Sequence, residues 1–385
     1  MVSVDGAHSH RPPICDIEVL LMGKSSELRV GMIGCGGIAG GKHLPALAKL
    51  SPVKMVAFCD IVEDRASSLA GKFGVNGAKV YKDYRALLEA EKLDVVHVCT
   101  PNTSHSEITV AALEAGCHVM CEKPMAKTSE GARKMVEAAK RTGKKLNIGY
   151  QNRYRADSQY LKKYCEQGGL GEIYFAKAHA LRRRAVPTWG VFLDEEAQGG
   201  GPLIDIGTHS LDLTLWMMNN YEPEFAVGTT YHKLGQRKDS ANAWGPWDPK
   251  AFTVEDSAFG FVKFRNGATV FLETSWALNV RTDGEAICTL CGTEAGADMW
   301  DGLHINGERF SKLYTEKAQL EAGSVAFYSG TDAAPQDVEA KLWIDAVLED
   351  KDPVVLPEQA MVVTEILEAI YKSHTTGQPV YFDKR

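Results

Sequence analysis

The stretch that decides the fold is Leu28-Arg29-Val30-Gly31-Met32-Ile33-Gly34-Cys35-Gly36-Gly37-Ile38-Ala39. Residues 28–33 predict a β-strand, the glycines predict a tight turn, and a helical pattern follows through Leu50. This is the order of the G-x-G-x-x-G/A turn that holds a dinucleotide pyrophosphate at the start of a helix. Gly34 permits the turn, Gly36 lets the phosphate approach the backbone, and Ala39 lets helix pack on strand. We therefore expect a dinucleotide to be bound by Gly34, Gly36, Gly37, Ile38 and Ala39.

A second predicted strand, 53–59, ends in Asp60, which stands 24 residues after Gly36. A carboxylate there can accept hydrogen bonds from the adenosine ribose hydroxyls and repel a 2′-phosphate. The residue favours NAD over NADP.

Strands and helices then alternate. Strands are predicted at 79–81, 94–100, 118–121 and 145–150, and helices at 64–73, 84–90, 105–115 and 129–142. This alternation predicts a parallel, doubly wound α/β sheet with its ligands at the carboxyl ends of the strands. Two polar motifs fall at such ends. We expect cofactor contacts from their residues Thr100, Pro101, Asn102, His105, Glu122 and Lys123.

After about residue 170 the pattern changes to β-type segments, at 173–181, 224–231, 257–264, 268–277 and 285–291. They predict an α+β domain with an open, mostly antiparallel sheet and helices on one face. The tail, 336–348 and 358–374, is predicted to be helical and is a candidate to pack back on the first domain. We expect a disordered extension over 1–27, with Met22 as the true start, a nucleotide-binding domain over 28–150, and a substrate and oligomerisation domain over 151–385.

One apolar helix carries charges. It follows the glycines at 199–201 and places Asp205, His209 and Asp212 at i, i+4 and i+7, on one face. Unpaired buried charge costs several kcal/mol, so such a row faces either a cleft or a structural partner. The helix alone leaves open whether it holds a core Asp–His hydrogen bond or the wall of an active site.

The length and composition of the chain exclude several classes of function. A chain of 385 residues is too long for one core, and its net charge of −7 argues against nucleic acid as a partner. Nine scattered cysteines favour a reducing cytoplasm over a disulfide framework, and no apolar run has the length of a membrane span. Cys288 and Cys291 lack a second pair at zinc spacing, so we expect no metal site.

Four motifs together resemble the Gfo/Idh/MocA oxidoreductase family: the glycine turn at 34–39, Cys121-Glu122-Lys123-Pro124, residues 148–154, and the glycines 199–201 leading to Asp205-x-x-x-His209. The resemblance covers nearly the whole chain after residue 28. It implies a Rossmann domain that binds NAD, with Gln151 among the cofactor contacts, and a second domain whose open sheet often mediates homo-oligomers. It also implies that Lys123, Asp205 and His209 surround the reacting carbon.

Within that family, the arginines 182–184 and Pro187-Thr188-Trp189-Gly190 resemble members that oxidise the C-3 hydroxyl of glucosides, including C-glycosides and the anhydrosugar levoglucosan. The resemblance implies substrate contacts by Arg153, Tyr154, Arg184, Trp189 and His209. For the arginines, a solvated charged face is as good an interpretation as a substrate site. For Trp189, the alternative is an ordinary aromatic residue of the core or of an interface. Alternative functions are an inositol dehydrogenase, a glycosidase that uses transient C-3 oxidation, and a non-catalytic NAD sensor.

Alcohol oxidation needs a base for the hydroxyl proton. We assign this role to His209, whose ordinary pKa lies near neutrality. Asp205 is expected to orient the imidazole or raise its pKa, and Lys123 to stabilise the developing alkoxide. In the competing assignment Lys123 is the base, through a depressed pKa. Asp212 is expected to be structural.

Overall fold

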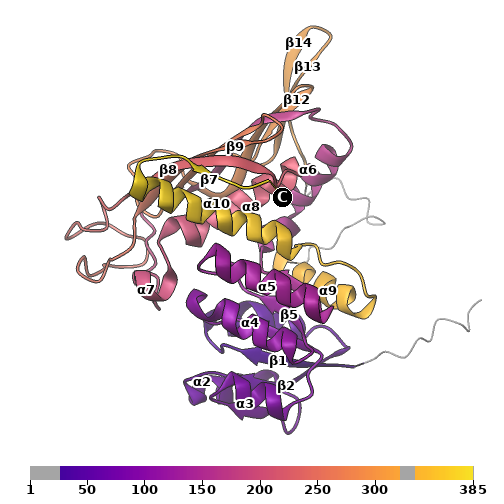
Figure 1. Cartoon of the computed structure of the whole chain (residues 1–385). Helices are drawn as coiled ribbons and strands as arrows, with labels where there is room; N and C mark the ends of the chain where they lie inside the picture. Colours follow the sequence, from indigo (N-terminus) through magenta and orange to yellow (C-terminus); the bar gives the residue numbers. More distant parts are fainter. Residues whose placement is uncertain (1–26, 321–333, 385) are drawn as a thin grey trace, which may run out of the picture.

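The computed structural model describes residues 27–320 and 334–384. The expected disordered extension and the alternative start at Met22 lie outside the described residues, apart from Glu27. Figure 1 shows two stacked parts, a smaller α/β part below and a broad sheet with its helices above.

The lower part contains a parallel sheet in the order β3-β2-β1-β4-β5-β6. Its strands are β1 (Leu28–Ile33), β2 (Val53–Cys59), β3 (Lys79–Tyr81), β4 (Val95–Val98), β5 (His118–Cys121) and β6 (Leu146–Ile148). Its helices are η1 (Ala39–His43), α1 (Leu44–Leu47), α2 (Glu63–Phe73), α3 (Tyr84–Ala90), α4 (His105–Glu114) and α5 (Ser129–Thr142). The strand order reverses between β1 and β4, which is where doubly wound sheets bind ligands. The predicted Rossmann fold is confirmed.

Local signals explain where these helices begin and end. The Asp83 side chain accepts from the backbone N–H groups of Arg85 and Ala86 at the start of α3. Thr128 caps α5 by accepting from Gly131 N, and Gly143 ends that helix in the left-handed conformation. Side-chain oxygens at the N-cap and glycine after the last turn satisfy backbone groups that the helix itself leaves unpaired.

The upper part contains a nine-stranded sheet in the order β14-β13-β12-β11-β7-β10-β9-β8-β15. Its strands are β7 (Ile173–Leu181), β8 (Pro223–Tyr231), β9 (Ser257–Phe264), β10 (Thr269–Ser275), β11 (Gly284–Gly292), β12 (Ala295–Asp298), β13 (His304–Arg309), β14 (Lys312–Lys317) and β15 (Val380–Tyr381). Within the described part of this nine-stranded sheet, only β7 and β10 pair in parallel, and the other neighbouring strands are antiparallel. The mostly antiparallel sheet is confirmed, whereas β12 to β15 extend it beyond the five predicted segments.

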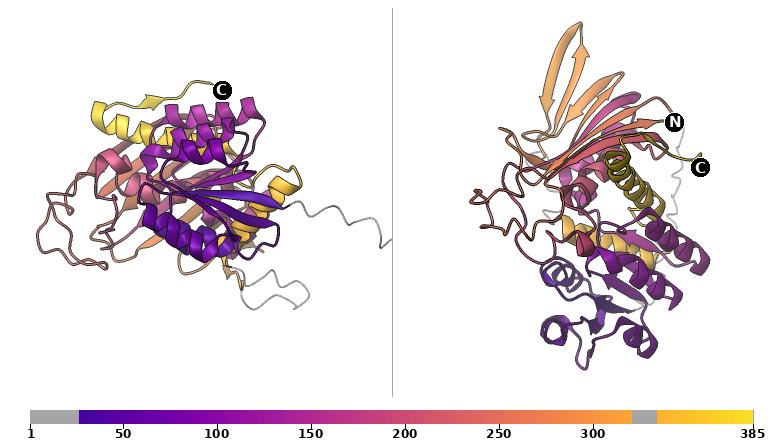
Figure 2. Two further views of the ribbon diagram at one scale, coloured as in Figure 1. Left: turned by 90° about the horizontal axis from the view of Figure 1, so that it is seen from below. Right: turned by 60° about the vertical axis from the view of Figure 1, so that its left-hand side comes forward.

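Helices cover one face of this sheet: α8 (Thr208–Met218) and α10 (Pro357–Thr376) lie between the two parts (Figure 1), and α6 (Ala156–Glu166) packs against α8. Along β9 buried and partly exposed residues alternate, as expected for a strand with one face on a core. Among the described residues, the opposite face carries no helix in the right-hand view of Figure 2.

The C-terminal tail reaches the lower part. Helix α9 (Pro335–Leu348) packs on α1, where Glu339 pairs with Lys42 at 2.9 Å and Asp337 with Lys49 at 2.6 Å. Helix α10 lies against α5. These contacts fix the two sheets relative to each other. No helix in the described ranges has both the length and the apolarity of a membrane span.

Candidate active site

A cavity of about 250 Å³ lies where the two parts meet. Its lining comes from the loop after β5, the short helix η3 (Gln151–Tyr154), the end of β7, the η4–α8 helix and the start of β11. The lining residues are Lys123, Gln151, Asn152, Arg182, Asp205, Ile206, His209, Glu285 and Ala286. The structure thus brings the predicted residues Lys123, Gln151, Asp205 and His209 into one cavity.

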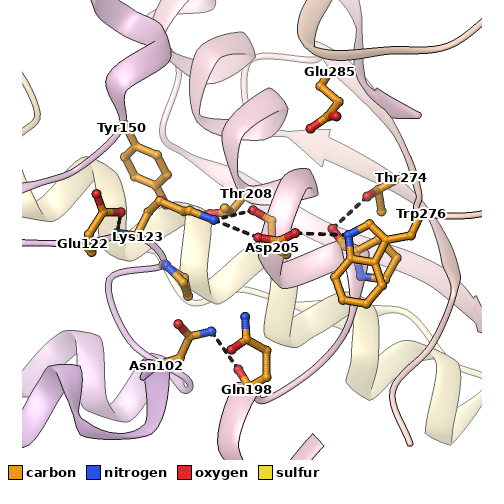
Figure 3. Close-up of polar contacts among 12 residues, drawn as sticks. Asn102, Glu122, Lys123, Tyr150, Gln198, Asp205, Thr208, Thr274, Trp276 and Glu285 are labelled. Atoms are coloured by element: carbon orange, nitrogen blue, oxygen red, sulfur yellow. Dashed lines mark hydrogen bonds and ion pairs between the residues drawn. The ribbon is translucent and has the colours of Figure 1, made fainter. Parts of the chain in front are cut away.

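Lys123 and Asp205 form an ion pair across this cavity. Lys123 Nζ lies 2.9 Å from Asp205 Oδ1 and also donates to the Asp205 carbonyl at 3.0 Å. On the other side, Trp276 Nε1 donates to Asp205 Oδ2 at 3.1 Å, so the carboxylate is held between two donors (Figure 3). Burial raises the pKa of Asp205, but the charges of Lys123 and Arg182 outweigh it and hold that pKa below its usual value.

His209 faces the cavity without an orienting carboxylate. Its Nδ1 is buried and has no hydrogen-bond partner within the described ranges, and the Tyr150 ring packs edge-on at a centroid distance of 6.2 Å. Burial and the Lys123 charge lower the pKa of His209 to about 3, so the imidazole is neutral at physiological pH. The charge of Asp205 does raise the pKa of His209, as expected, but burial and Lys123 outweigh it. The orienting hydrogen bond expected between Asp205 and His209 is not formed among the described residues.

The reason lies in the helix geometry. The helix begins with a π-helical turn, η4 (Leu203–Gly207), which is wider than an α-helical turn. The i, i+4 and i+7 alignment assumed from the sequence holds only for a regular α-helix. Here Asp205 and His209 share the cavity while Asp205 bonds to Lys123 and Trp276 instead.

Glu255, from the loop between β8 and β9, holds the start of this helix. Its carboxylate accepts from Gly201 N at 2.8 Å, from Leu203 N at 3.0 Å and from the Tyr371 hydroxyl at 2.9 Å. Burial raises the pKa of Glu255 to about 7, although these three donors stabilise the charged form. The sequence offered no signal for this contact, because the cap comes from a distant segment instead of the N-cap residue itself.

Asp212 points away from the cavity into a buried ion pair. Arg153 donates to both of its carboxylate oxygens, at 2.6 and 2.9 Å, and also to Val354 O and the Gln359 side chain. The Arg153 side chain is fully buried and Tyr154 is 4% exposed. Neither lines the cavity, so the structure does not place Arg153 and Tyr154 where substrate contacts were expected. The structural role expected of Asp212 agrees with this pair.

The arginine that reaches the cavity is Arg182, two residues before the predicted Arg184. Arg182 and Glu285 form a two-pronged ion pair, with Nε–Oε1 at 2.5 Å and Nη2–Oε2 at 2.8 Å. Arg184 instead donates to Leu278 O and to Asn279 Oδ1. Trp189 is 52% exposed and does not line the cavity. Sequence reasoning missed Glu285 because only the pairing of β11 with β7 brings it beside Arg182.

The glycine turn fits a dinucleotide. A Cβ on Gly34 would stand 2.5 Å from the Cys99 backbone, and Gly34 has φ +90°, so only glycine fits there. A Cβ on Gly36 or Gly37 would meet nothing within 4 Å, which leaves open space in front of the turn. At the end of β2, Asp60 accepts from Cys35 N and Val62 N, both at 2.8 Å. The carboxylate retains lone pairs for ribose hydroxyls.

Other predicted cofactor residues brace the loops around the site. His105 lies with its two ring nitrogens 2.8 Å from the carbonyls of Pro124 and Thr100. Both nitrogens must donate, and although burial opposes the charge, these contacts and Cys121 raise the pKa of His105 to about 9. Asn102 Nδ2 donates to Gln198 O at 2.9 Å, at the end of the short helix α7 (Glu195–Gln198).

Glu122 is equally occupied, because Lys42 Nζ and His43 Nε2 each lie 2.8 Å from its Oε1. Asn102 Nδ2, both ring nitrogens of His105 and the Glu122 carboxylate therefore bond to protein groups. These contacts position the loops around the site, and the cofactor contacts expected of the three residues stay a prediction. Thr100 and Pro101 contribute through the loop that His105 holds.

The fold and the site together define an NAD-binding oxidoreductase. Residues 28–150 match the family described as "Oxidoreductase family, NAD-binding Rossmann fold", and residues 162–382 match its "C-terminal alpha/beta domain". The chain belongs to the Gfo/Idh/MocA oxidoreductase family, and its cofactor is NAD.

Relatives with known activities are similar over different lengths. The chain is 40% identical to the D-glucoside 3-dehydrogenase of Escherichia coli K12, over 92% of this chain and 98% of that protein. An inositol 2-dehydrogenase of Salmonella typhimurium is 32% identical over 50% of this chain and 55% of its own. The structure of a levoglucosan dehydrogenase with NADH and levoglucosan has a TM-score of 0.76 at 22% identity, covering 92% of this chain and 99% of that one.

Proposed function

We propose that this enzyme oxidises the C-3 hydroxyl of a glucoside to give a 3-keto glycoside. One observation carries the proposal: a cavity of about 250 Å³ whose walls combine Lys123, Asp205 and His209 with the Arg182–Glu285 pair. The first three supply the polar chemistry of alcohol oxidation, and the ion pair offers donors and acceptors for further sugar hydroxyls. Similarity over nearly full length to a D-glucoside 3-dehydrogenase favours this substrate over a cyclitol.

In the mechanism we propose, Lys123 and His209 act on the same substrate oxygen. The Lys123 ammonium, held by Asp205, donates a hydrogen bond to that oxygen and stabilises the negative charge that develops on it. The neutral His209 imidazole is free to accept the hydroxyl proton, although its lowered pKa makes it a weaker base than an ordinary histidine. The alkoxide stabilisation by Lys123 offsets this by making the hydroxyl proton easier to remove. When bound, NAD supplies the acceptor for the hydride. The glycine turn at 34–39 and Asp60 would hold it, with further contacts proposed for the loop at Thr100 and Pro101, Lys123 and Gln151.

The competing base, Lys123, would have to lose the charge that pairs with Asp205 at 2.9 Å. Comparing pH–rate profiles of His209→Ala and Lys123→Ala separates the two assignments. We expect His209→Ala to lose most of its kcat. A His209→Ala enzyme with nearly wild-type kcat would eliminate His209 as the base.

The substrate class is tested by following NADH absorbance with methyl and aryl glucosides, glucose, levoglucosan and myo-inositol. Reduction of the product with borodeuteride then labels the oxidised carbon, and we expect the label at C-3. Turnover of myo-inositol alone would replace this proposal by the cyclitol alternative. Release of free aglycone by the purified enzyme would replace the proposed function by the glycosidase alternative. NAD binding without turnover of any polyol would favour the non-catalytic NAD sensor.

We also propose that the enzyme is a homo-oligomer in the cytoplasm. The uncovered face of the large sheet carries a row of aromatic rings in mutual contact, at centroid distances of 5.3 to 6.0 Å, and Phe271 and Tyr381 in it are 41% and 71% exposed. The row consists of Phe175, Phe271, Phe261, Phe225 and Tyr381. All eight cysteines in the described ranges are free, as a reducing compartment requires. Light scattering of wild type and Phe271→Lys tests the oligomer, and cell fractionation tests the location.

A further inference from the structure

Two exposed tryptophans stand beside the cavity, on loops that the mechanism does not use. Trp189 lies in the loop after β7, and Trp244 lies in residues 232–256, which contain no helix or strand. Their rings meet edge to face at 5.0 Å, and their exposed fractions are 52% and 43%. Long loops without secondary structure are usually functional, and exposed tryptophans in contact are a common feature of binding surfaces.

Trp244 contacts a residue of the cavity wall directly, and Trp189 connects to the active site through two further aromatic residues. The Arg182 guanidinium, which lines the cavity, lies 5.0 Å from the centroid of the Trp244 ring. On the other side, Phe192 bridges Trp189 to Trp276 at centroid distances of 5.9 and 6.3 Å. Trp276 is the residue that bonds to Asp205. The aromatic pair is therefore continuous with the mouth of the cavity.

The cavity is small for a substituted sugar. Its volume of about 250 Å³ falls below the roughly 300–1,000 Å³ of pockets for drug-sized ligands. A bulky group on the anomeric carbon of a bound glucoside would therefore extend beyond the cavity wall. The Arg182–Glu285 pair forms part of that wall, and the Trp244 ring lies beyond Arg182.

We propose that Trp189 and Trp244 form a subsite for the aglycone of the glucoside, and that they select substrates in which this group is flat and apolar. The inference rests on the proposed glucoside oxidation. An aromatic aglycone would pack against the two indole rings in the edge-to-face or offset arrangements that aromatic pairs prefer. The Arg182–Glu285 pair would separate this subsite from the sugar site.

The test compares phenyl β-glucoside with methyl β-glucoside. In Trp189→Ala and in the double variant with Trp244→Ala, we expect the ratio of kcat/KM for phenyl over methyl glucoside to fall about tenfold or more. Trp244→Phe should retain most of the ratio, because it keeps an aromatic face under Arg182. Phe310→Ala is the matched control, because Phe310 is 91% exposed at the tip of the β13–β14 hairpin, on strands outside the cavity.

Calorimetric binding of phenyl β-glucoside to the NAD-loaded enzyme gives a readout independent of turnover. Binding that weakens in the tryptophan variants supports the subsite even if no glucoside is oxidised, in which case only the proposed reaction fails. A phenyl-to-methyl ratio within twofold of wild type in the double variant, together with unchanged phenyl glucoside affinity, overturns the subsite. That second result leaves the proposed reaction standing.

Discussion

The ammonium of Lys123 lies 2.9 Å from the carboxylate of Asp205, and the two residues come from different sheets of the molecule. Lys123 follows β5 of the parallel sheet, whereas Asp205 lies on the helix that packs under the antiparallel sheet. Their side chains are 18% and 6% exposed, so the pair is largely shielded from water. Charges in such a position act more strongly than they do in bulk solvent.

Removing the donor should impair catalysis. We expect Lys123→Met to lower kcat about 10²–10³-fold, the range found when a donor to a developing oxyanion is deleted. Trp276→Phe, which removes the hydrogen bond to the other Asp205 oxygen, should lower kcat by a smaller factor. Steady-state kinetics with saturating NAD measure both. Equal losses in the two variants would contradict the distinct role of Lys123.

We expect His209 to make the free energy of unfolding depend on pH in the acidic range. The folded pKa of about 3 lies below the ordinary 6.5, so the unfolded chain binds a proton that the folded chain does not. Stability from the neutral ring is complete above about pH 6.5 and is lost as the pH falls toward 3. The His209→Asn variant has no titrating ring at this position, so it lacks this pH-dependent contribution to stability. Urea unfolding should therefore show wild type losing stability relative to His209→Asn between about pH 6.5 and pH 4, and parallel curves would contradict the lowered pKa.

Glu255 should give the opposite dependence. Its folded pKa of about 7 lies above the ordinary 4.5, so the folded chain keeps a proton that the unfolded chain releases. Wild type should lose stability relative to Glu255→Gln as the pH rises from about 4.5 to about 7.

Because Glu255 holds the start of the helix that carries Asp205 and His209, Glu255→Gln should also lower kcat. Tyr371→Phe, which removes one neutral donor, should have a smaller effect. A change confined to stability would show that the helix keeps its place without the carboxylate.

Arg153 is expected to act on stability and not on substrate binding. Arg153→Met leaves Asp212 buried without its partner, and breaking such a pair costs about 3–5 kcal/mol. The double variant Arg153→Met with Asp212→Leu should recover part of this loss, because it removes the remaining charge. Denaturant unfolding measures the stability, and the KM for glucoside should stay near wild type in the folded fraction. A selective rise in KM would restore the substrate role predicted from the sequence.

Asp60 is expected to set coenzyme preference. Asp60→Asn keeps the side-chain shape and removes the charge that repels a 2′-phosphate. We expect the ratio of kcat/KM for NADP over NAD to rise about tenfold or more. The turn itself should survive, because the amide oxygen can still accept from one of the two N–H donors, Cys35 or Val62. An unchanged ratio of kcat/KM for NADP over NAD would show that Asp60 does not face the adenosine ribose of the coenzyme.

The sequence predicted best what depends on neighbours in the chain. The glycine turn, the alternation of strands and helices and the spacing from Gly36 to Asp60 are local patterns, and they give the Rossmann sheet almost strand by strand. Lys123, Asp205 and His209 converge in one cavity because each lies in a motif at the end of a strand or on a buried helix.

The errors have a common physical cause. Arg153 follows Gln151 by two residues, yet Gln151 faces the cavity and Arg153 turns into the core, because side chains on a short helix point in different directions. Glu255 and Glu285 reach the site only through the register of the large sheet and its loops. A single sequence carries no local signal for such pairings.

The proposed catalytic pair spans the two sheets, and so does the main hydrophobic core. Val96 of the parallel sheet and Val262 of the antiparallel sheet belong to one continuous cluster, so the angle between the halves cannot change without disturbing that packing. Helix α9 adds Trp343 and Ile344 to the second core, which lies in the lower part. Loss of activity on heating is therefore expected to coincide with melting of the shared core, and removal of helix α9 should destabilise the fold as well as the Lys123–Asp205 contact.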